Sequence, residues 1–279
     1  MLANKTIAFL GAGSMAEAMI SGIVESKTVR NDQVIVSNRC NEDRLIELSN
    51  RYGIRGQKRD ELNFEEVDIF VLAMKPKDID NVLSSIKGDI RADQVVLSVL
   101  AGIPTAYMED RLNDNQQVIR VMPNTSSMIG ESATAMSPGK HTGMDNVMDA
   151  KELLKSIGEV YIIEEAQMDI FTGIAGSGPA YFYYLMEHIE KVGKENGLDI
   201  EQARKIGAQT ILGAAKMMMT QEEAPEELRK KVTSPNGTTQ AGLEALKEYG
   251  GGEAISQAVK GAAKRSKEIS EKLEKVTIK

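Results

Sequence analysis

Short, almost uninterrupted apolar runs alternate with longer polar stretches in the first part of the chain. The strongest runs are rich in β-branched residues and lie at 6–10, 34–36, 67–73, 95–100 and 118–122, with weaker ones at 133–136 and 160–163. Helix-compatible segments separate them, and these are 14–25, 42–51, 76–86 and 145–157. Strands that are apolar at every position are buried on both faces, as in a parallel sheet covered by helices on both sides. The pattern predicts an α/β domain with a doubly wound, mainly parallel sheet.

From about residue 165 onward, signals for β-strands almost disappear. Long helix-compatible stretches cover 179–196, 200–221, 239–248 and 253–276. We place the domain boundary at this change, so that residues 1–164 form the α/β domain and residues 165–279 form an all-α domain. The helix that carries Met217, Met218 and Met219 is apolar around much of its circumference and needs burial on several sides. Either the core of a helical bundle or an interface between subunits would supply that burial.

The composition is that of an ordinary globular protein. Hydrophobic residues make up 42% of the 279 positions, and the formal net charge of −7 argues against nucleic-acid or anionic-membrane binding. The single cysteine, Cys40, allows no intrachain disulfide, and the two histidines supply too little for us to expect a metal. No apolar run is long enough to span a membrane, and the N-terminal residues lead into a strand rather than a signal peptide. We therefore expect a cytoplasmic protein.

A glycine-rich turn follows the first predicted strand and opens the first predicted helix. Its spacing is G-x-G-x-x-A, and its residues are Gly11, Ala12, Gly13, Ser14, Met15 and Ala16. In such a turn the first glycine allows a tight bend, and the second lets a pyrophosphate approach the backbone. Free amides and the helix dipole then attract the phosphates. The turn predicts dinucleotide binding by a Rossmann-type domain.

The end of the second predicted strand distinguishes the two nicotinamide coenzymes. Domains that bind NAD usually place an Asp or Glu there to hold the ribose 2′-hydroxyl. Here the strand ends in Ser37, Asn38 and Arg39, which include no carboxylate. A guanidinium pairs with a 2′-phosphate, and the hydroxyl and the amide can donate hydrogen bonds to it. We expect NADPH as the preferred coenzyme and NADH as a weaker one.

Loops after two later strands supply further candidates for coenzyme contacts. The carboxyl ends of parallel strands border the crevice of an open α/β sheet, where small residues let the backbone approach a ligand. The candidates are Ala73, Met74, Lys75, Pro76, Ala101 and Gly102. For Lys75 two interpretations remain open, a place near the phosphates or nicotinamide and a simple loop cap.

Two loops in the helical half precede predicted helices. Residues 176–181, GSGPAY, place small residues before a proline in a first turn. Residues 234–239, SPNGTT, offer consecutive amides and hydroxyls at a helix N-terminus. Such a loop can bind an anion of carboxylate size, and a well-capped turn would have the same residues.

Together these motifs resemble the Δ1-pyrroline-5-carboxylate reductase family. The matching segments run in the family's order from about residue 9 to residue 242, and they are FLGAGSMAEAM, AMKP, SVLAGI, RVMPNT, GSGPAY and VTSPNGTTQAG. The last is close to the family signature, although Asn236 stands where members commonly have glycine, and Asn tolerates left-handed geometry. Asp60 stands where we expect asparagine near the adenosine, which puts a contact from this position in doubt.

The resemblance implies a Rossmann domain followed by a helical dimerisation and substrate domain of the 6-phosphogluconate dehydrogenase C-terminal type. It implies a homodimer or a multiple of dimers, with the active site between the domains and built from two chains. The implied reaction is NADPH-dependent hydride transfer to the C=N bond of L-Δ1-pyrroline-5-carboxylate, which gives L-proline. Thr239 is then the catalytic residue, with its hydroxyl on the ring nitrogen. The implied substrate-binding residues are Ser234, Asn236, Gly237, Thr238, Thr239 and Glu165.

Two other functions share part of this pattern. A β-hydroxyacid dehydrogenase has the same domain order, but it carries its catalytic lysine in a G-x-x-x-K-x-x-x-N pattern that we do not find. A non-catalytic NADP(H)-binding regulatory protein has no need of a carboxylate-binding loop. Consumption of NADPH when the cyclic imine is added would distinguish the three functions.

Overall fold

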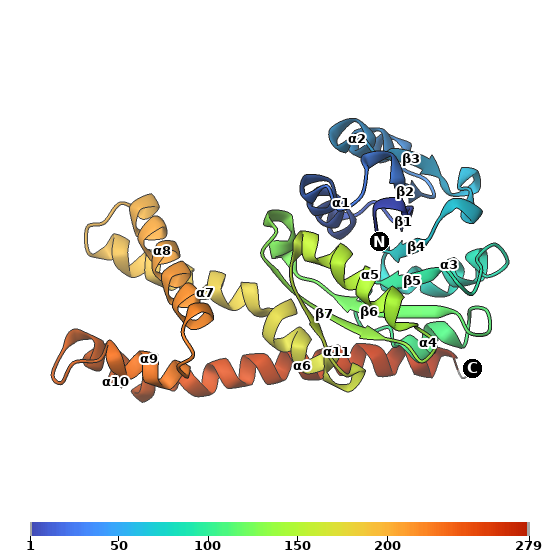
Figure 1. The fold of residues 1–279 in the computed structure, drawn as a ribbon. Coiled ribbons are helices and arrows are strands. Elements are labelled where there is room, and N and C mark those ends of the chain that lie inside the picture. The colour runs from blue at the N-terminus through green and yellow to red at the C-terminus, as the bar shows by residue number, and fades with distance from the viewer. Residues whose placement is uncertain (1, 278–279) are drawn as a thin grey trace. The chain divides into compact units, whose positions relative to one another are not determined.

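The computed structural model describes residues 2–277, and their contacts divide the chain into two units (Figure 1). The first unit contains residues 2–177 together with 261–277, and the second contains residues 178–260. The long helix α11 (Gly251–Thr277) begins in the second unit, and its later turns belong to the first.

An eight-stranded sheet forms the centre of the first unit, in the order β3-β2-β1-β4-β5-β6-β7-β8. The strands are β1 (Ile7–Leu10), β2 (Val34–Asn38), β3 (Arg55–Lys58), β4 (Ile69–Leu72), β5 (Val95–Ser98), β6 (Gln117–Met122), β7 (Ser132–Pro138) and β8 (Gly158–Ile162). Neighbours from β3 to β6 are parallel, β7 is antiparallel to β6, and β8 is parallel to β7. The order reverses at β1, so a ligand crevice is expected at the carboxyl ends of β1 and β4. The predicted doubly wound, mainly parallel sheet is confirmed.

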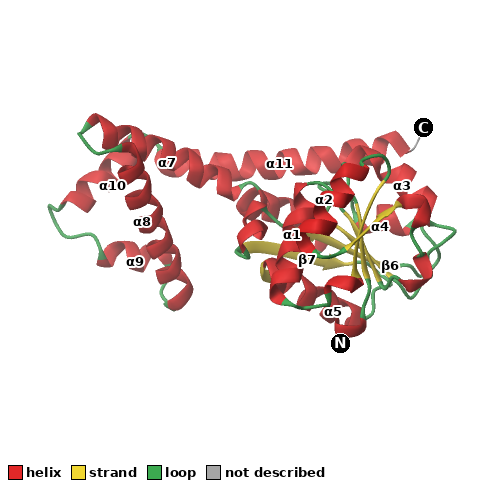
Figure 2. Cartoon of the chain, turned by 90° about the horizontal axis from the view of Figure 1, so that it is seen from above, coloured by secondary structure: helices red, strands yellow, loops and turns green. Residues whose placement is uncertain are grey.

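Helices cover both faces of this sheet (Figure 2). One face packs against α1 (Ser14–Ser26), α2 (Glu42–Tyr52) and α5 (Met144–Leu154), and the other against α3 (Ile79–Ile86) and α4 (Thr105–Glu109). Ile7 and Phe9 of β1 belong to the first of these cores, and Ala8 and Leu10 belong to the second. All four side chains are fully buried. This is why the strand is apolar at every position.

Strand β3 is a part of the sheet that the hydrophobic pattern does not reveal. Its sequence, RGQK, is polar, and the strand lies at the edge of the sheet, where it pairs only with β2. Edge strands need no apolar side chains because their pairing uses the backbone. The weaker apolar runs at 133–136 and 160–163, which suggest edge strands, do form strands β7 and β8. Only β8 lies at an edge, because β7 pairs with both β6 and β8.

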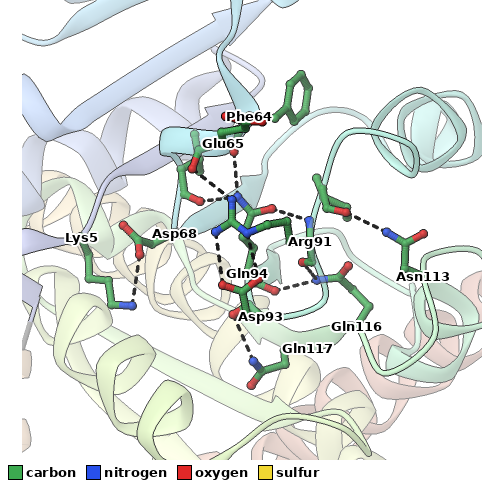
Figure 3. A network of polar contacts seen from close by, with 12 residues as sticks. Lys5, Phe64, Glu65, Asp68, Arg91, Asp93, Gln94, Asn113, Gln116 and Gln117 are labelled. Atoms are coloured by element: carbon green, nitrogen blue, oxygen red, sulfur yellow. Dashed lines mark hydrogen bonds and ion pairs between the residues drawn. The ribbon is translucent and has the colours of Figure 1, made fainter.

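Polar side chains connect the loops at the amino ends of β4, β5 and β6 (Figure 3). The buried Gln94 amide donates to the carbonyls of Phe64 at 2.7 Å and Val67 at 2.5 Å. The equally buried Gln116 donates to the carbonyls of Arg91 and Gln94. These contacts satisfy loop carbonyls at the amino ends of the strands, whereas the expected ligand crevice lies at the carboxyl ends. They therefore stabilise the fold and do not form part of the crevice.

The second unit consists of helices. They are α7 (Gly178–Glu195), α8 (Ile200–Thr220), α9 (Pro225–Lys231), α10 (Thr238–Glu248) and the first turns of α11, whereas the short α6 (Met168–Phe171) belongs to the first unit. Between α7 and α8, Gly197 has a φ of +91°, and the Asp199 carboxylate accepts from the first N–H groups of α8. Arg204 and Glu190 pair across the two helices at 2.6 Å. A helical hairpin therefore forms where the sequence has its glycine stop and aspartate cap.

Large apolar side chains of the second unit remain exposed in the single chain. Met217 and Met218 are each about half exposed, Met219 is 76% exposed and Tyr249 is 84% exposed. Of the two sources of burial considered for the Met217–Met219 helix, the core of a bundle is therefore wrong for the single chain. Within residues 2–277, no helix is both long and apolar enough to cross a membrane.

Candidate active site

The glycine-rich turn joins β1 to α1 and lies against the loop that follows β4. The N–H of Gly11 donates to the carbonyl of Ser37 at 2.9 Å, and the φ of Gly11 is +128°, which L-residues avoid. A Cβ atom on Gly11 would lie 2.6 Å from the carbonyl carbon of Ala73, so only glycine lets these backbones meet. Gly13 is the N-cap of α1 and offers no side-chain cap. The first-turn N–H groups, which include those of Ser14 and Met15, therefore remain available to an anion.

Residues from the ends of β1, β2 and β4 line one cavity of about 230 Å³, together with Arg59 after β3. Gly11 comes from the end of β1, Met74 follows β4, and Ser37, Asn38 and Arg39 come from the end of β2. Ser37 is fully buried, and its Oγ has no hydrogen-bond partner within the described residues. A buried hydroxyl without a partner is unfavourable, so this atom is suited to a ligand oxygen. The structure thus brings the glycine-rich turn close to the end of β2, where the sequence predicts the choice between NADPH and NADH.

The other loop candidates lie at the same carboxyl edge of the sheet. Ala73 donates its N–H to the carbonyl of Leu10 at 3.1 Å, and Lys75 precedes a 3₁₀ turn at Pro76–Asp78. The loop that contains Ala101 continues to Gly102, whose φ is +76°. A Cβ atom on Gly102 would lie 2.7 Å from Ile269 Cγ2, so this loop packs directly against α11 within the first unit.

Arg44 on α2 supports the glycine turn from behind. Its Nε donates to the carbonyl of Ala12 at 3.2 Å, and its other nitrogens pair with Glu17 and Glu47. Burial by itself would raise the pKa of Glu17, but hydrogen bonds from Arg44, Tyr52 and Arg51 and the charge of Arg44 outweigh it and lower the pKa. Glu17 is therefore ionised at neutral pH and holds Arg44 in place.

Glu165 lies in a polar cluster of the first unit. Its Oε1 accepts from the backbone N–H of Thr105 at 2.9 Å, and its Oε2 accepts from the hydroxyl of the same residue at 2.6 Å. Arg120, which is 7% exposed, pairs with Oε1 at 3.3 Å. Both oxygens of the carboxylate thus have partners, and together they cap the start of α4.

The SPNGTT loop lies in the second unit and leads into α10. Asn236 has a φ of +58°, as its left-handed position requires, and its N–H donates to Gln240 Oε1 at 2.8 Å. The N–H of Gly237 donates to the carbonyl of Ser234 at 3.0 Å, so that amide is already used within the turn. The N–H groups of Thr238 and Thr239 have no partner within the described residues, and α10 has no side-chain cap. The exposed start of α10 therefore has free donors for an anion.

Sequence reasoning missed two arginines close to the glycine-rich turn, one that contacts Ala12 and one that lines a cavity with Gly11. Arg44 escaped notice because it resembles an ordinary charged residue of an amphipathic helix. Arg59 escaped notice because it follows β3, which the hydrophobic pattern does not reveal. Asp60 beside it lines a neighbouring cavity of about 520 Å³. Among the described residues no group of three or more His, Cys, Asp or Glu side chains could hold a metal ion.

Two family models match the chain. Residues 6–102 match the model described as NADP oxidoreductase coenzyme F420-dependent. Residues 165–269 match the model described as pyrroline-5-carboxylate reductase dimerisation.

Curated proteins and solved structures agree with these matches. The chain is 61% identical to pyrroline-5-carboxylate reductase 1 of Bacillus subtilis over 98% of this chain and 92% of the relative. It is 36% identical to the pyrroline-5-carboxylate reductase of Methanosarcina acetivorans over 96% of this chain and 99% of the relative. A solved pyrroline-5-carboxylate reductase from Coxiella burnetii superposes with a TM-score of 0.86 at 29% identity, covering 96% of this chain and 99% of that one. The Plasmodium falciparum pyrroline carboxylate reductase, solved with NADP bound, superposes with a TM-score of 0.85 at 26% identity over the same shares. The chain therefore belongs to the pyrroline-5-carboxylate reductase family and is an oxidoreductase.

Proposed function

We propose that this protein reduces L-Δ1-pyrroline-5-carboxylate to L-proline with NADPH, the last step of proline biosynthesis. The observation that carries the choice of reaction is the 61% identity over 98% of the chain with a reductase of that name. An uncapped helix start behind a glycine turn and a second uncapped helix start at residue 238 support it. They would hold the two anionic reactants, the coenzyme and the carboxylate of the imine.

The first unit would bind the coenzyme. Bound NADPH supplies the hydride, and the protein residues bind and orient it. The first-turn amides of α1, at Ser14 and Met15, would hold the pyrophosphate, with Ala12 and Gly13 allowing its close approach. Ser37, Asn38 and Arg39 would hold the 2′-phosphoribose, and this supports a preference for NADPH over NADH. The loops 73–76 and 101–102 would border the remainder of the coenzyme.

The SPNGTT loop would bind the carboxylate of the substrate. The free N–H groups of Thr238 and Thr239 are its donors, and Ser234, Asn236 and Gly237 shape the turn that presents them. The hydroxyl of Thr239 would hydrogen-bond the ring nitrogen, which gains a proton as the C=N carbon accepts the hydride. A hydroxyl is a poor acid, so its role is orientation and the relay of a proton from water. Glu165 would order the segment that begins the helical domain through its bonds to Thr105 and Arg120.

The reaction is tested by following the absorbance of NADPH when the imine is added to purified protein. Consumption of NADPH with formation of proline is expected, and its absence would refute the proposed function. Thr239→Ala should lower kcat by at least about tenfold while NADPH affinity stays within about twofold. Thr239→Ser, which keeps the hydroxyl, should recover most of the activity. Thr220→Ala, at the end of α8, is the matched control.

Arg39→Ala tests the coenzyme preference. Loss of the guanidinium should raise the KM for NADPH by about tenfold or more and leave the KM for NADH nearly unchanged. An equal change for both coenzymes would remove Arg39 from the 2′-phosphate site.

A homodimer, or a multiple of dimers, would cover the exposed apolar side chains of the second unit. The exposed aromatic residues Phe182, Tyr183, Tyr184 and Tyr249 support this, as does the match of residues 165–269 to a dimerisation model. We place the functional boundary between residues 164 and 165, where that model begins, with the coenzyme domain before it and the dimerisation and substrate domain after it. Light scattering on the purified protein should give at least twice the chain mass of 30.5 kDa. A single cysteine, which allows no intrachain disulfide, supports a cytoplasmic location.

A further inference from the structure

Two neighbouring arginines have no carboxylate partner, unlike most arginines of this chain. Within residues 2–277 the exceptions are Arg39, Arg59 and Arg229, whereas the other arginines each form an ion pair. Arg229 lies in the second unit, on α9. Arg39 and Arg59 lie together in the first unit, so an uncompensated pair of positive charges gathers at one place.

The register of the sheet places these two arginines side by side. Strands β2 and β3 are parallel, and Asn38 at the end of β2 is opposite Lys58 at the end of β3. The next residues, Arg39 and Arg59, therefore leave the carboxyl edge of the sheet at the same level. Both line the cavity of about 230 Å³ that contains Gly11 and Ser37. Both also line two adjacent cavities of about 420 and 520 Å³.

Arg59 is held in an environment that disfavours its charge. Its Nε and Nη1 atoms are buried and have no hydrogen-bond partner within the described residues. Burial and, to a smaller extent, the neighbouring Arg39 guanidinium lower the pKa of Arg59 to about 10. The group remains protonated at neutral pH, so the folded chain keeps a partly desolvated cation without compensation.

Carboxylates near Arg59 do not relieve this situation. Asp60 and Asp89 line the largest of the three cavities, and Asp78 lines the smallest. Within the described residues, none of these carboxylates forms an ion pair with Arg59 or Arg39. In contrast, Arg55 on the same strand β3 pairs with Glu66 at 3.1 Å. A purely structural arginine at the end of β3 would be expected to find a partner of this kind. Arg59 instead lines three cavities together with Arg39.

We infer that Arg59 is a second specificity-determining residue for NADPH, and that Arg39 and Arg59 hold the 2′-phosphate between two guanidinium groups. This inference rests on the proposed function. A phosphate monoester carries a charge of about −1.5 to −2 at neutral pH and has three strong acceptor oxygens. Two guanidinium forks match that charge and that number of acceptors, and the buried hydroxyl of Ser37 adds a further donor. The bound phosphate would satisfy the donors of Arg59 and remove the repulsion between the two cations.

The test compares ligands that differ only in the 2′-phosphate. Binding of adenosine 2′,5′-bisphosphate and of 5′-AMP is measured by calorimetry for the wild-type protein and for Arg59→Gln. The variant should lose about 10- to 100-fold in affinity for the bisphosphate and less than about twofold for 5′-AMP. Arg59→Lys keeps a positive charge but not the guanidinium fork, so its affinity for the bisphosphate should lie between those of the wild-type protein and Arg59→Gln. Arg30→Gln is the matched control, because Arg30 is an exposed arginine of the same unit whose partner is Asp32.

Kinetics give a second readout of the same inference. For Arg59→Gln the KM for NADPH should rise while the KM and kcat with NADH stay unchanged, which also shows that the variant is folded. An equal loss for both coenzymes, or for both adenosine ligands, would overturn the inference. If the wild-type protein discriminates between the two adenosine ligands and Arg59→Gln discriminates between them equally well, the inference is wrong and the proposed function stands. If the wild-type protein does not discriminate, the coenzyme preference and the role of Arg59 both fall, and imine reduction with either coenzyme still tests the reaction separately.

Discussion

Arg44→Met tests how the glycine turn is supported. Methionine keeps much of the aliphatic length of the side chain, but it removes every donor. The variant loses the hydrogen bond from Nε to the carbonyl of Ala12 at 3.2 Å and the ion pairs with Glu17 and Glu47. Glu17 keeps its contacts with Arg51 and Tyr52, so the change removes part of the network and not all of it.

The magnitude follows from the burial of the pair. The side chains of Arg44 and Glu17 are 21% and 17% exposed, so solvent screens this pair less than a surface pair. Hydrogen bonds to charged groups contribute about 1.5–3 kcal/mol. We expect a loss of about 2 kcal/mol, which corresponds to a fall in Tm of about 4–8 °C for a domain of roughly 150–250 residues. Arg30→Met, which breaks a fully exposed pair with Asp32, should leave the Tm nearly unchanged.

The loss of stability in Arg44→Met should become smaller as the pH falls. The pKa of Glu17 lies below its usual value of 4.5 in the folded protein, so the group stabilises the fold above its unfolded pKa. That contribution is lost as the pH falls through the lowered pKa. The Tm difference between the wild-type protein and Arg44→Met should therefore be complete near pH 7 and should shrink steadily below about pH 4. A difference that persists in acid, or one no larger than that of Arg30→Met, would refute this account of the network.

Arg44 should also affect the coenzyme without affecting its specificity. In a trans peptide the carbonyl and the following N–H point in opposite directions, so a carbonyl of Ala12 held by Arg44 aims the Gly13 N–H away from α2. Loss of Arg44 should raise the KM for NADPH and for NADH by the same factor, whereas loss of Arg39 or Arg59 should affect NADPH alone. A selective effect of Arg44→Met on NADPH would contradict this positioning role.

Three further changes test other positions. Gly11→Ala should abolish coenzyme binding and lower the Tm, because the new Cβ would overlap the backbone of Ala73 and the φ of this position is +128°. Titration with NADPH measures the affinity, and an unchanged affinity would contradict this prediction. Asn236→Gly should change the free energy of unfolding by less than about 1 kcal/mol and keep the activity. Glycine adopts the left-handed geometry more easily, and this offsets the greater entropy of the unfolded chain. A large loss of kcat would show that the amide side chain acts on the substrate. Glu165→Gln should lower the free energy of unfolding by about 1–2 kcal/mol, measured by thermal unfolding. The reason is that the buried Arg120 loses its only charged partner among the described residues. No change would mean that the ion pair between Glu165 and Arg120 is dispensable for stability.

Local patterns determined much of the first unit. The run at 6–10 predicts a strand buried on both faces, and β1 is such a strand. The glycine turn predicts its own position between a strand and a helix, and α1 begins directly after Gly13. In the second unit, Gly197 and Asp199 have the residue types of a helix stop and a helix cap, and they lie between α7 and α8. Each of these features depends on residues within one or two turns of one another, so a sequence contains the whole signal.

Tertiary structure alone decided which distant residues meet. Arg39 and Arg59 are neighbours because the polar strand β3 pairs with β2, and nothing in RGQK reveals that pairing. Arg44 reaches Ala12, and Glu165 reaches Thr105 and Arg120, only after the helices have packed on the sheet. Backbone pairing at a sheet edge and ion pairs between elements require no periodic pattern and no fixed spacing along the chain. Local residue patterns therefore specify the elements and the glycine-rich turn, whereas the packing of the elements brings the surrounding charges to that turn.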